Sequence, residues 1–249
     1  MMKKALLAAA VALLGFSQMA KAQTNIQLFY DFGSDRMQFT STIEGFYSDN
    51  WGNTFFFVDH DFNKKANEGV NALTGTYMEV ARCFNFWQNV PVLGDFSLQV
   101  EYNGGIYKNY YIKNALLVGV DYFLHSSDFR NTFNFKVLYK KIASTIQQVP
   151  LQFTFVWGMQ DLFGLKGLCF SGFADFWWED HLLFSGHQGS LDGQLSHVVF
   201  ISEPQLWYNV GQWIGVDNFN LGGEVELSYD FGSSKGFWVR PCFGVKWVF

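Results

Sequence analysis

Aromatic and acidic side chains alternate at a spacing of two along two stretches of this sequence. The positions that share this spacing are Phe55, Phe57, Asp59 and Asp61 in the first stretch and Phe173, Asp175 and Trp177 in the second. Aromatic rings stack on the flat ring of a ligand, and carboxylates accept hydrogen bonds from its hydroxyl or amino groups. The pattern therefore indicates a binding surface for a small solute that carries both a ring and polar substituents.

Tyr77 and Glu79 repeat this pairing between the two stretches. A spacing of two brings side chains to one face only where the backbone is extended, because successive strand residues point to opposite sides. The alternative is that these aromatic side chains merely fill the interior of a narrow protein. The elements that position them decide which interpretation applies.

The C-terminal part shows most clearly that these elements are strands. From Phe237 to Phe249 every odd position is apolar, and the even positions include Arg240 and Lys246. The stretch before it alternates in the same way, with acidic residues such as Glu226 on one side. A period of two predicts β-strands that have one apolar face.

An apolar sheet face has to be covered by a second protein layer or by lipid. The composition favours lipid, because 20% of the residues are aromatic and 24 are glycine, which is typical of a barrel with aromatic girdles and a polar lumen. After the N-terminal region, polar residues interrupt every apolar stretch before it reaches the roughly 20 residues of a membrane helix. A secreted, lectin-like β-sandwich is the alternative. We expect an all-β protein, a transmembrane antiparallel up-and-down β-barrel.

Twelve strand-like runs can be assigned along the chain. They are 25–32, 36–47, 51–62, 74–86, 93–103, 112–124, 129–140, 149–160, 164–177, 197–208, 219–231 and 236–249. An even number is expected for a bacterial barrel whose termini both lie on the periplasmic side. The longest external loop is then 178–196, whereas the inward connector 209–218 is longer than a tight turn.

Charged residues assign the faces, because a charge facing lipid at the membrane midplane costs about 2–4 kcal/mol. Unbroken alternation from Glu79 would place Arg82 toward lipid. We expect a bulge between Val80 and Phe84 that returns Arg82 to the lumen. The alternative is that Arg82 lies close enough to the membrane surface to reach the headgroups.

The N-terminus has the pattern of a secretory signal peptide. Lys3 and Lys4 precede the apolar run 5–16, and Ala20 and Ala22 form a small-x-small cleavage site. We expect residues 1–22 to be the signal peptide, with cleavage after Ala22, and residues 23–249 to form the barrel in the bacterial outer membrane. Cleavage removes three lysines and lowers the formal charge from −5 to −8, which argues against nucleic-acid binding.

Cys83, Cys169 and Cys242 are odd in number, fall inside strand-like runs and lack metal-ligand spacing. We therefore expect small side chains within strands rather than a disulfide framework, and neither a metal nor another cofactor.

Three short motifs resemble one family. The run 55–59 is similar to the aromatic-x-aromatic-x-Asp strand of the Tsx-like nucleoside-specific channel-forming outer-membrane porins, 76–84 resembles their Met-Glu-aliphatic strand, and 171–176 resembles a later Phe-x-x-Phe/Asp strand. The sequence looks closest to an uncharacterised outer-membrane family grouped with those porins. The resemblance implies a monomeric twelve-stranded barrel that passes nucleosides by facilitated diffusion. The residues that it places along the solute path are Phe55, Phe57, Asp59, Glu79 and Arg82.

The expected function is a channel for facilitated diffusion of small polar solutes, with nucleosides as the finer expectation and membrane lipid as the other partner. A structural or adhesive barrel acting through loop 178–196 is the alternative. An outer-membrane hydrolase is disfavoured, because Gly-x-Ser-x-Gly is absent and the only histidine–acid group is a loop cluster. That cluster comprises Glu179, Asp180, His181 and His187. We expect no enzymatic activity.

Overall fold

The computed structural model describes residues 22–64, 69–108, 110–184 and 193–249. The expected signal peptide lies outside these residues except for Ala22, and so does His187. No helix in the described part of the chain is long and apolar enough to cross a membrane.

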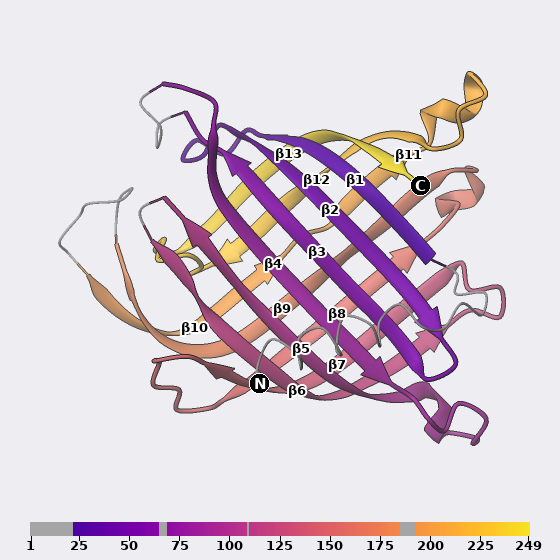
Figure 1. Cartoon of the computed structure of the whole chain (residues 1–249), viewed down its shortest axis with the longest axis horizontal. Coiled ribbons are helices and arrows are strands. Elements are labelled where there is room, and N and C mark those ends of the chain that lie inside the picture. Colours follow the sequence, from indigo (N-terminus) through magenta and orange to yellow (C-terminus); the bar gives the residue numbers. More distant parts are fainter. Residues whose placement is uncertain (1–21, 65–68, 109, 185–192) are drawn as a thin grey trace, which may run out of the picture.

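Antiparallel β-strands make up most of the described chain (Figure 1). They are β1 (Ala22–Asp31), β2 (Gln38–Asp49), β3 (Gly52–Phe62), β4 (Leu73–Phe84), β5 (Phe96–Tyr107), β6 (Tyr111–His125), β7 (Asn131–Ile142), β8 (Leu151–Met159), β9 (Leu168–Leu183), β10 (Gln194–Ser202), β11 (Gln205–Tyr208), β12 (Phe219–Tyr229) and β13 (Phe237–Val248). Three short 3₁₀ turns lie in connectors, namely η2 (Leu93–Asp95), η3 (Leu162–Gly164) and η4 (Val210–Trp213).

The sheet closes on itself and forms a barrel. Apart from β10 and β11, each strand pairs with its neighbours in sequence, and β1 pairs with β13, with Asn25 opposite Val248. β10 and β11 both lie between β9 and β12, so they are two halves of one strand. The break falls at Glu203 and Pro204, since proline has no N–H to donate to a ladder. The barrel therefore has twelve strand positions, which confirms the predicted fold.

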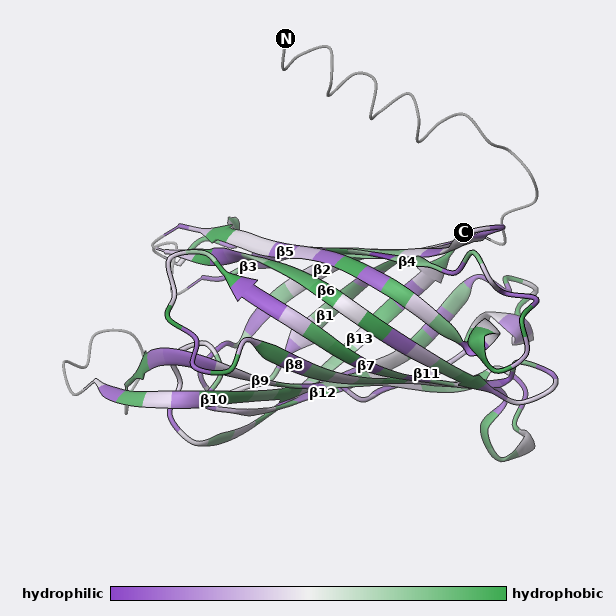
Figure 2. Ribbon diagram, turned by 90° about the horizontal axis from the view of Figure 1, so that it is seen from below, coloured by the Kyte–Doolittle hydropathy of each residue, from purple (hydrophilic) through white to green (hydrophobic). Residues whose placement is uncertain are grey.

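Apolar side chains cover the outside of the barrel and polar ones line the inside. On β1, Ile26 and Leu28 are 40% and 46% exposed, whereas Asn25 and Gln27 are 5% and 1% exposed. Figure 2 shows the same alternation as green and purple bands along the strands. This distribution is the reverse of that in a water-soluble protein and is typical of a membrane barrel.

The barrel is flattened, so that two walls of strands lie opposite each other (Figure 2). In Figure 2, β3, β4 and β5 lie in the upper wall and β9, β10 and β12 in the lower one. Glu79 on β4 and Asp175 on β9 both take inward positions, and the two strands lie in opposite walls. The interior of the barrel is thus the place where the sequence-predicted residues meet.

Several connectors differ from the sequence-based expectation. β9 continues to Leu183 and β10 begins at Gln194, because Leu182 pairs with Leu195 and the ladder extends beyond Trp177. Both ends of the expected loop 178–196 are therefore strand, and only 184–193 connects the two strands. At the other end, 85–95 is longer than a tight turn and holds η2. The expected asymmetry between long external loops and short internal turns is only partly present.

Candidate functional site

Aromatic rings on β3 and β4 form a continuous row inside the barrel. The ring centroids of Phe55 and Phe57 are 6.1 Å apart, and those of Phe57 and Tyr77 are 5.9 Å apart. The Tyr77 hydroxyl donates a hydrogen bond to Glu79 Oε1 at 2.5 Å. With Asp59 beside Phe57, these residues form what we call the aromatic–acid wall: Phe55, Phe57, Asp59, Tyr77 and Glu79.

The acids of β3 point into the lumen, as the sequence predicted. Asp59 accepts a hydrogen bond from Thr42 at 2.5 Å and Asp61 accepts one from Thr40 at 2.6 Å, both from the inward face of β2. Every residue of β3 keeps intermediate accessibility, whereas Gln99 and Ser228 elsewhere on the inner face are fully buried. The inward side chains of the aromatic–acid wall are therefore accessible to water.

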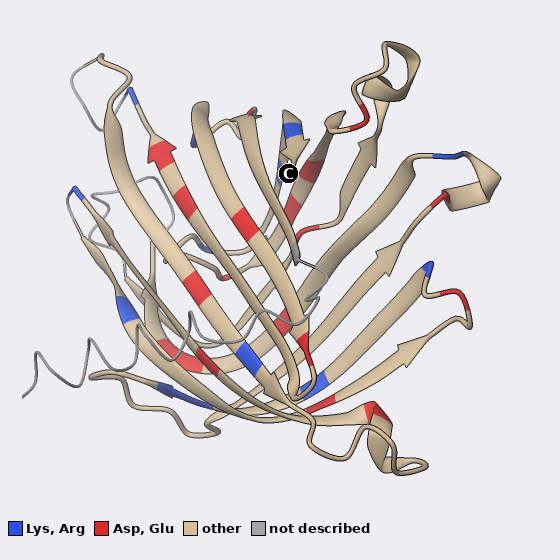
Figure 3. Ribbon diagram, turned by 45° about the vertical axis from the view of Figure 1, so that its right-hand side comes forward, with Lys and Arg blue, Asp and Glu red and all other residues tan. Residues whose placement is uncertain are grey.

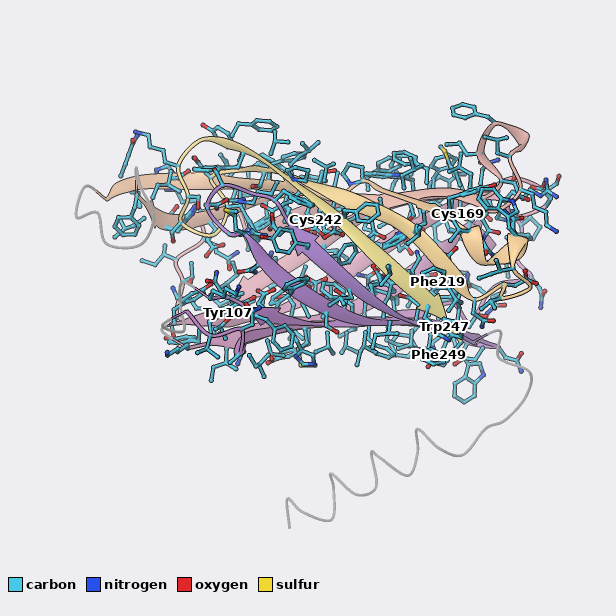
Figure 4. All side chains as sticks on the ribbon, turned by 90° about the horizontal axis from the view of Figure 1, so that it is seen from above. Tyr107, Cys169, Phe219, Cys242, Trp247 and Phe249 are labelled. Carbon is cyan, nitrogen blue, oxygen red and sulfur yellow. The ribbon has the colours of Figure 1, made fainter. Side chains whose placement is uncertain are left out.

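Tyr107 adds a second ring beside the acids of β3. Its hydroxyl donates to Asp61 Oδ2 at 3.1 Å. The ring lies directly over Gly75 of β4, where a Cβ would come within 1.9 Å of Tyr107 Cδ1. Figure 4 places Tyr107 near one end of the barrel and Trp247 near the other. The β3 acids thus extend the polar path toward the Tyr107 end.

Asp175 lies on the opposite wall. Thr154 of β8 donates a hydrogen bond to it. Its Oδ1 atom is buried and has no hydrogen-bond partner in the described structure. This carboxylate therefore has unused acceptor capacity.

Phe173 and Trp177 share the inward face of β9 with Asp175, but they belong to an apolar cluster. Its buried members come from β6, β7, β9 and β10 and are Ala115, Leu117, Leu138, Ile142, Trp177, Val199 and Ile201, with Phe173 and Phe231 packed against them. Trp177 is only 7% exposed, and the Lys140 ammonium covers its ring at 3.7 Å. Trp177 therefore fills space inside the cluster, whereas Phe173 is only partly buried at its edge. The sequence pattern did not reveal this cluster, although Leu138 lies two residues before Lys140 and therefore shares its face of β7.

Arg82 does not face the lumen, and the expected bulge is absent. The β3–β4 and β4–β5 ladders run without a register shift through Val80, Arg82 and Phe84. Arg82 donates to Thr54 at 3.1 Å and to Asp49 at 2.9 Å, both of which lie on the outer side of the sheet. It sits near the end of β4, where a long side chain can reach polar surroundings. The second of the two interpretations is therefore the correct one.

Acidic side chains greatly outnumber basic ones on the inner face, and Figure 3 marks the acidic and basic positions along the strands. Twelve carboxylates on the strands or at the β10–β11 break face inward: Asp31, Glu44, Asp59, Asp61, Glu79, Glu101, Asp121, Asp175, Glu179, Glu203, Glu224 and Glu226. Four basic side chains share this face: Lys136, Lys140, Arg240 and Lys246. Among these described acids, only Asp31 and Glu226 form ion pairs with a described base. The others are held by neutral donors or by longer-range interactions.

A second lysine lies on an indole ring near the barrel closure. Lys246 Nζ is 4.4 Å from the ring centroid of Trp207, which also packs against Phe29 at 5.5 Å. Trp207 Nε1 donates to Gln205 Oε1, and Gln205 Nε2 donates to Glu224 Oε2. Gln205 and Trp207 therefore share one face of β11.

Buried charges join the first and last strands through the connector 32–37. Arg240 on β13 binds Glu226 Oε1 at 2.5 Å and Asp35 Oδ2 at 2.8 Å. Arg36 binds Glu226 Oε2 at 2.6 Å and Asp31 Oδ2 at 3.4 Å. We call these five residues the closure network. Desolvation by itself would raise the pKa of Asp35, but the hydrogen bonds and charge of Arg240 hold that pKa below its ordinary value.

The histidine–acid group considered for catalysis is dispersed. Asp180 Oδ1 lies 2.6 Å from His197 Nδ1, whereas both ring nitrogens of His181 face backbone carbonyls, those of Glu179 and Asp230. Within the described residues no group of three or more His, Cys, Asp or Glu side chains is arranged to hold a metal. Cys83, Cys169 and Cys242 are free, and Cys83 donates to Gln99 inside the barrel.

Comparison with known proteins gives a family and a fold. A family model described as "Domain of unknown function (DUF5020)" matches residues 22–249. Comparison with curated proteins gave no match. The structure is similar to that of the NanC porin, with a TM-score of 0.54 at 9% identity over 90% of this chain and 98% of that one. The KdgM porin gives 0.48 at 10% identity, covering 91% and 99% of the two chains. OccAB3 of Acinetobacter baumannii gives 0.38 at 8% identity, covering 93% and 99%. At these identities the likeness is one of fold, and the resemblance to Tsx-like channels stays a prediction.

Proposed function

The chain belongs to the DUF5020 family, and we propose that it is a channel of the bacterial outer membrane through which small polar solutes diffuse. The apolar outer face of the barrel suits a bilayer, and the polar inner face suits an aqueous path. The barrel is proposed to act as a monomer and without catalysis. Its solutes are proposed to combine a flat ring with hydroxyl or amino groups, which nucleosides do.

The observation that carries this proposal is the aromatic–acid wall. The ring centroids of Phe57 and Tyr77 are 5.9 Å apart, with the rings tilted by 53°, and Asp59 and Glu79 lie beside them on an accessible part of the inner face. The flat ring of a solute can stack there whatever its exact structure, because stacking tolerates many kinds of ring. The neighbouring carboxylates accept hydrogen bonds from the polar groups of the solute.

The NanC and KdgM structures carry the word porin in their descriptions. For NanC the shared fold is in keeping with a channel, but it says nothing about which solute passes here. Selectivity has to be argued from the side chains of this lumen.

Current recordings in planar bilayers test the proposal. The purified mature protein should give steps of ion current, and added adenosine or thymidine should reduce that current. Phe57→Ala should weaken the block by on the order of tenfold, as expected for loss of about 1–3 kcal/mol of stacking. Phe56→Ala is the matched control, because Phe56 is the next residue on β3 and stacks on Tyr47 at the outer face. Absence of any conductance would overturn the channel. A conductance that added nucleosides do not reduce would reject only the nucleoside expectation.

A further inference from the structure

The charge of the lumen has a definite sign. Its twelve inward carboxylates face four inward bases, and the connector 32–37 adds one charge of each sign through Asp35 and Arg36. A narrow passage with walls of low dielectric constant concentrates ions of the opposite sign. The lumen should therefore attract cations and repel anions.

Two lysines show what the aromatic faces of this lumen bind. Lys140 places its ammonium group 3.7 Å from the Trp177 ring centroid, and Lys246 places its own 4.4 Å from that of Trp207. A cation over an aromatic face is attracted by the negative charge of the ring surface. The protein thus already holds two ammonium groups against indole rings inside the barrel.

The aromatic–acid wall offers the same chemistry without a resident cation. Asp59, Glu79 and Asp175 form no ion pair with any described lysine or arginine, although Lys140 acts on Glu79 and Asp175 at longer range. The Oδ1 atom of Asp175 is buried and without a hydrogen-bond partner. A buried acceptor without a partner is unfavourable, and an ammonium group would satisfy it.

Building on the channel function proposed above, we infer that the preferred solutes are organic cations that join a flat ring to a protonated amine. The ring stacks on Phe57 and Tyr77, and the ammonium group is held by Glu79, which already accepts a hydrogen bond from the Tyr77 hydroxyl, and by the unpaired oxygen of Asp175. Neutral ring compounds bind more weakly, and carboxylates and phosphates are excluded. Charge thus selects among the ring-bearing solutes.

Reversal potentials in a potassium chloride gradient test the sign of this selectivity. The wild-type channel should be about tenfold more permeable to K⁺ than to Cl⁻. This ratio is the lower end of the enrichment of counter-ions that a charged cleft produces. Asp175→Asn and Glu79→Gln should each lower this ratio, and the double variant should lower it further. Asp180→Asn is the matched control, since Asp180 lies on the same strand, has the opposite parity and pairs with His197. A reversal potential that shows a preference for Cl⁻ over K⁺ would overturn the inference and leave the channel function intact.

Calorimetry in detergent tests recognition without relying on current. Tyramine should bind, its anionic counterpart 4-hydroxyphenylacetate should not, and Asp175→Asn should weaken tyramine binding by about tenfold, the loss of roughly 1.4 kcal/mol. If the protein shows no conductance but still binds tyramine and not 4-hydroxyphenylacetate, the inferred recognition of cations is supported and the proposed channel function is rejected. If tyramine and 4-hydroxyphenylacetate bind equally well, or Asp175→Asn changes nothing, the inference is wrong. Migration of the unheated variants as folded barrels on gels confirms that each has folded.

Discussion

The Lys140 ammonium lies 3.7 Å from the ring centroid of Trp177 and donates a hydrogen bond to Gln152 Oε1 at 2.7 Å. This lysine therefore covers the apolar cluster on the side that faces the acids of the lumen. It also offsets part of the negative charge there, because Asp175, Glu179, Glu79 and Glu101 all act on it.

Lys140→Met should make the lumen more negative and remove a desolvated cation–π contact. We expect a larger preference for K⁺ over Cl⁻ and a loss of about 2 kcal/mol in the free energy of unfolding. Lys141→Met is the matched control, because Lys141 is the next residue of β7 and is exposed. Reversal potentials and urea unfolding measure the two effects. Equal behaviour of the two variants would contradict the assigned position of Lys140.

Arg240→Met should destabilise the barrel strongly. The change leaves Asp35 and Glu226 without their shared partner in a region where Arg240 is only 2% exposed. Breaking a buried pair in this way costs about 3–5 kcal/mol. Arg240→Lys should be intermediate, since lysine keeps the charge but loses the fork of the guanidinium group. Urea unfolding followed by tryptophan fluorescence measures both.

The control for this experiment is Arg130→Gln. Arg130 pairs with Asp128 at 3.5 Å, and these side chains are 58% and 56% exposed. An exposed pair contributes less than about 1 kcal/mol. If Arg130→Gln cost as much as Arg240→Met, the closure network would have no special role.

Acid should weaken the closure network through Asp35. The pKa of Asp35 is lower in the folded protein than its ordinary value, because Arg240 outweighs the effect of desolvation. A group of this kind stabilises the fold above its unfolded pKa, and its contribution is lost as the pH falls through the lower, folded pKa. We expect the stability difference between wild type and Asp35→Asn to narrow below about pH 4. A stability difference that does not narrow in this range would contradict the role given to Arg240.

The fold and the faces of most strands could be predicted because strand alternation is a local property. Asp59 and Glu79 were assigned to the lumen from parity alone, and their contacts with Thr42 and Tyr77 are in keeping with that. Connectors were less predictable, because the β9–β10 hairpin depends on pairing between Leu182 and Leu195. The local alternation of the sequence does not show how far such a ladder of paired strands extends.

The apolar cluster and Arg82 show a different limit. The cluster exists because side chains from β6, β7, β9 and β10 meet inside a flattened barrel, and sequence gives no distance between walls. The rule that charges face the lumen does not consider how deep a residue lies in the membrane. Arg82 lies near the end of β4, where its side chain reaches Asp49 instead of the lumen.

Arg82→Ala should therefore leave selectivity and nucleoside block unchanged. Its ion pair is partly exposed, with Asp49 at 49%, so the loss of stability should be below about 1 kcal/mol. This outcome separates Arg82 from Asp59, since Asp59→Asn should reduce the preference for K⁺. A change of reversal potential in Arg82→Ala would show that Arg82 reaches the lumen after all.

Gly75 and Tyr107 should be energetically coupled, because the ring of Tyr107 occupies the space of a side chain at position 75. Gly75→Ala has to displace this ring and break its hydrogen bond to Asp61, at a cost of about 1–3 kcal/mol. Tyr107→Phe removes only the hydroxyl and should cost about 1 kcal/mol. Tyr107→Ala frees the space, so adding Gly75→Ala to it should cost much less than in the wild type, as a double-mutant cycle measures. Additive costs in that cycle would mean that the ring does not lie over Gly75, and the polar path toward the Tyr107 end would then be wider than the structure indicates.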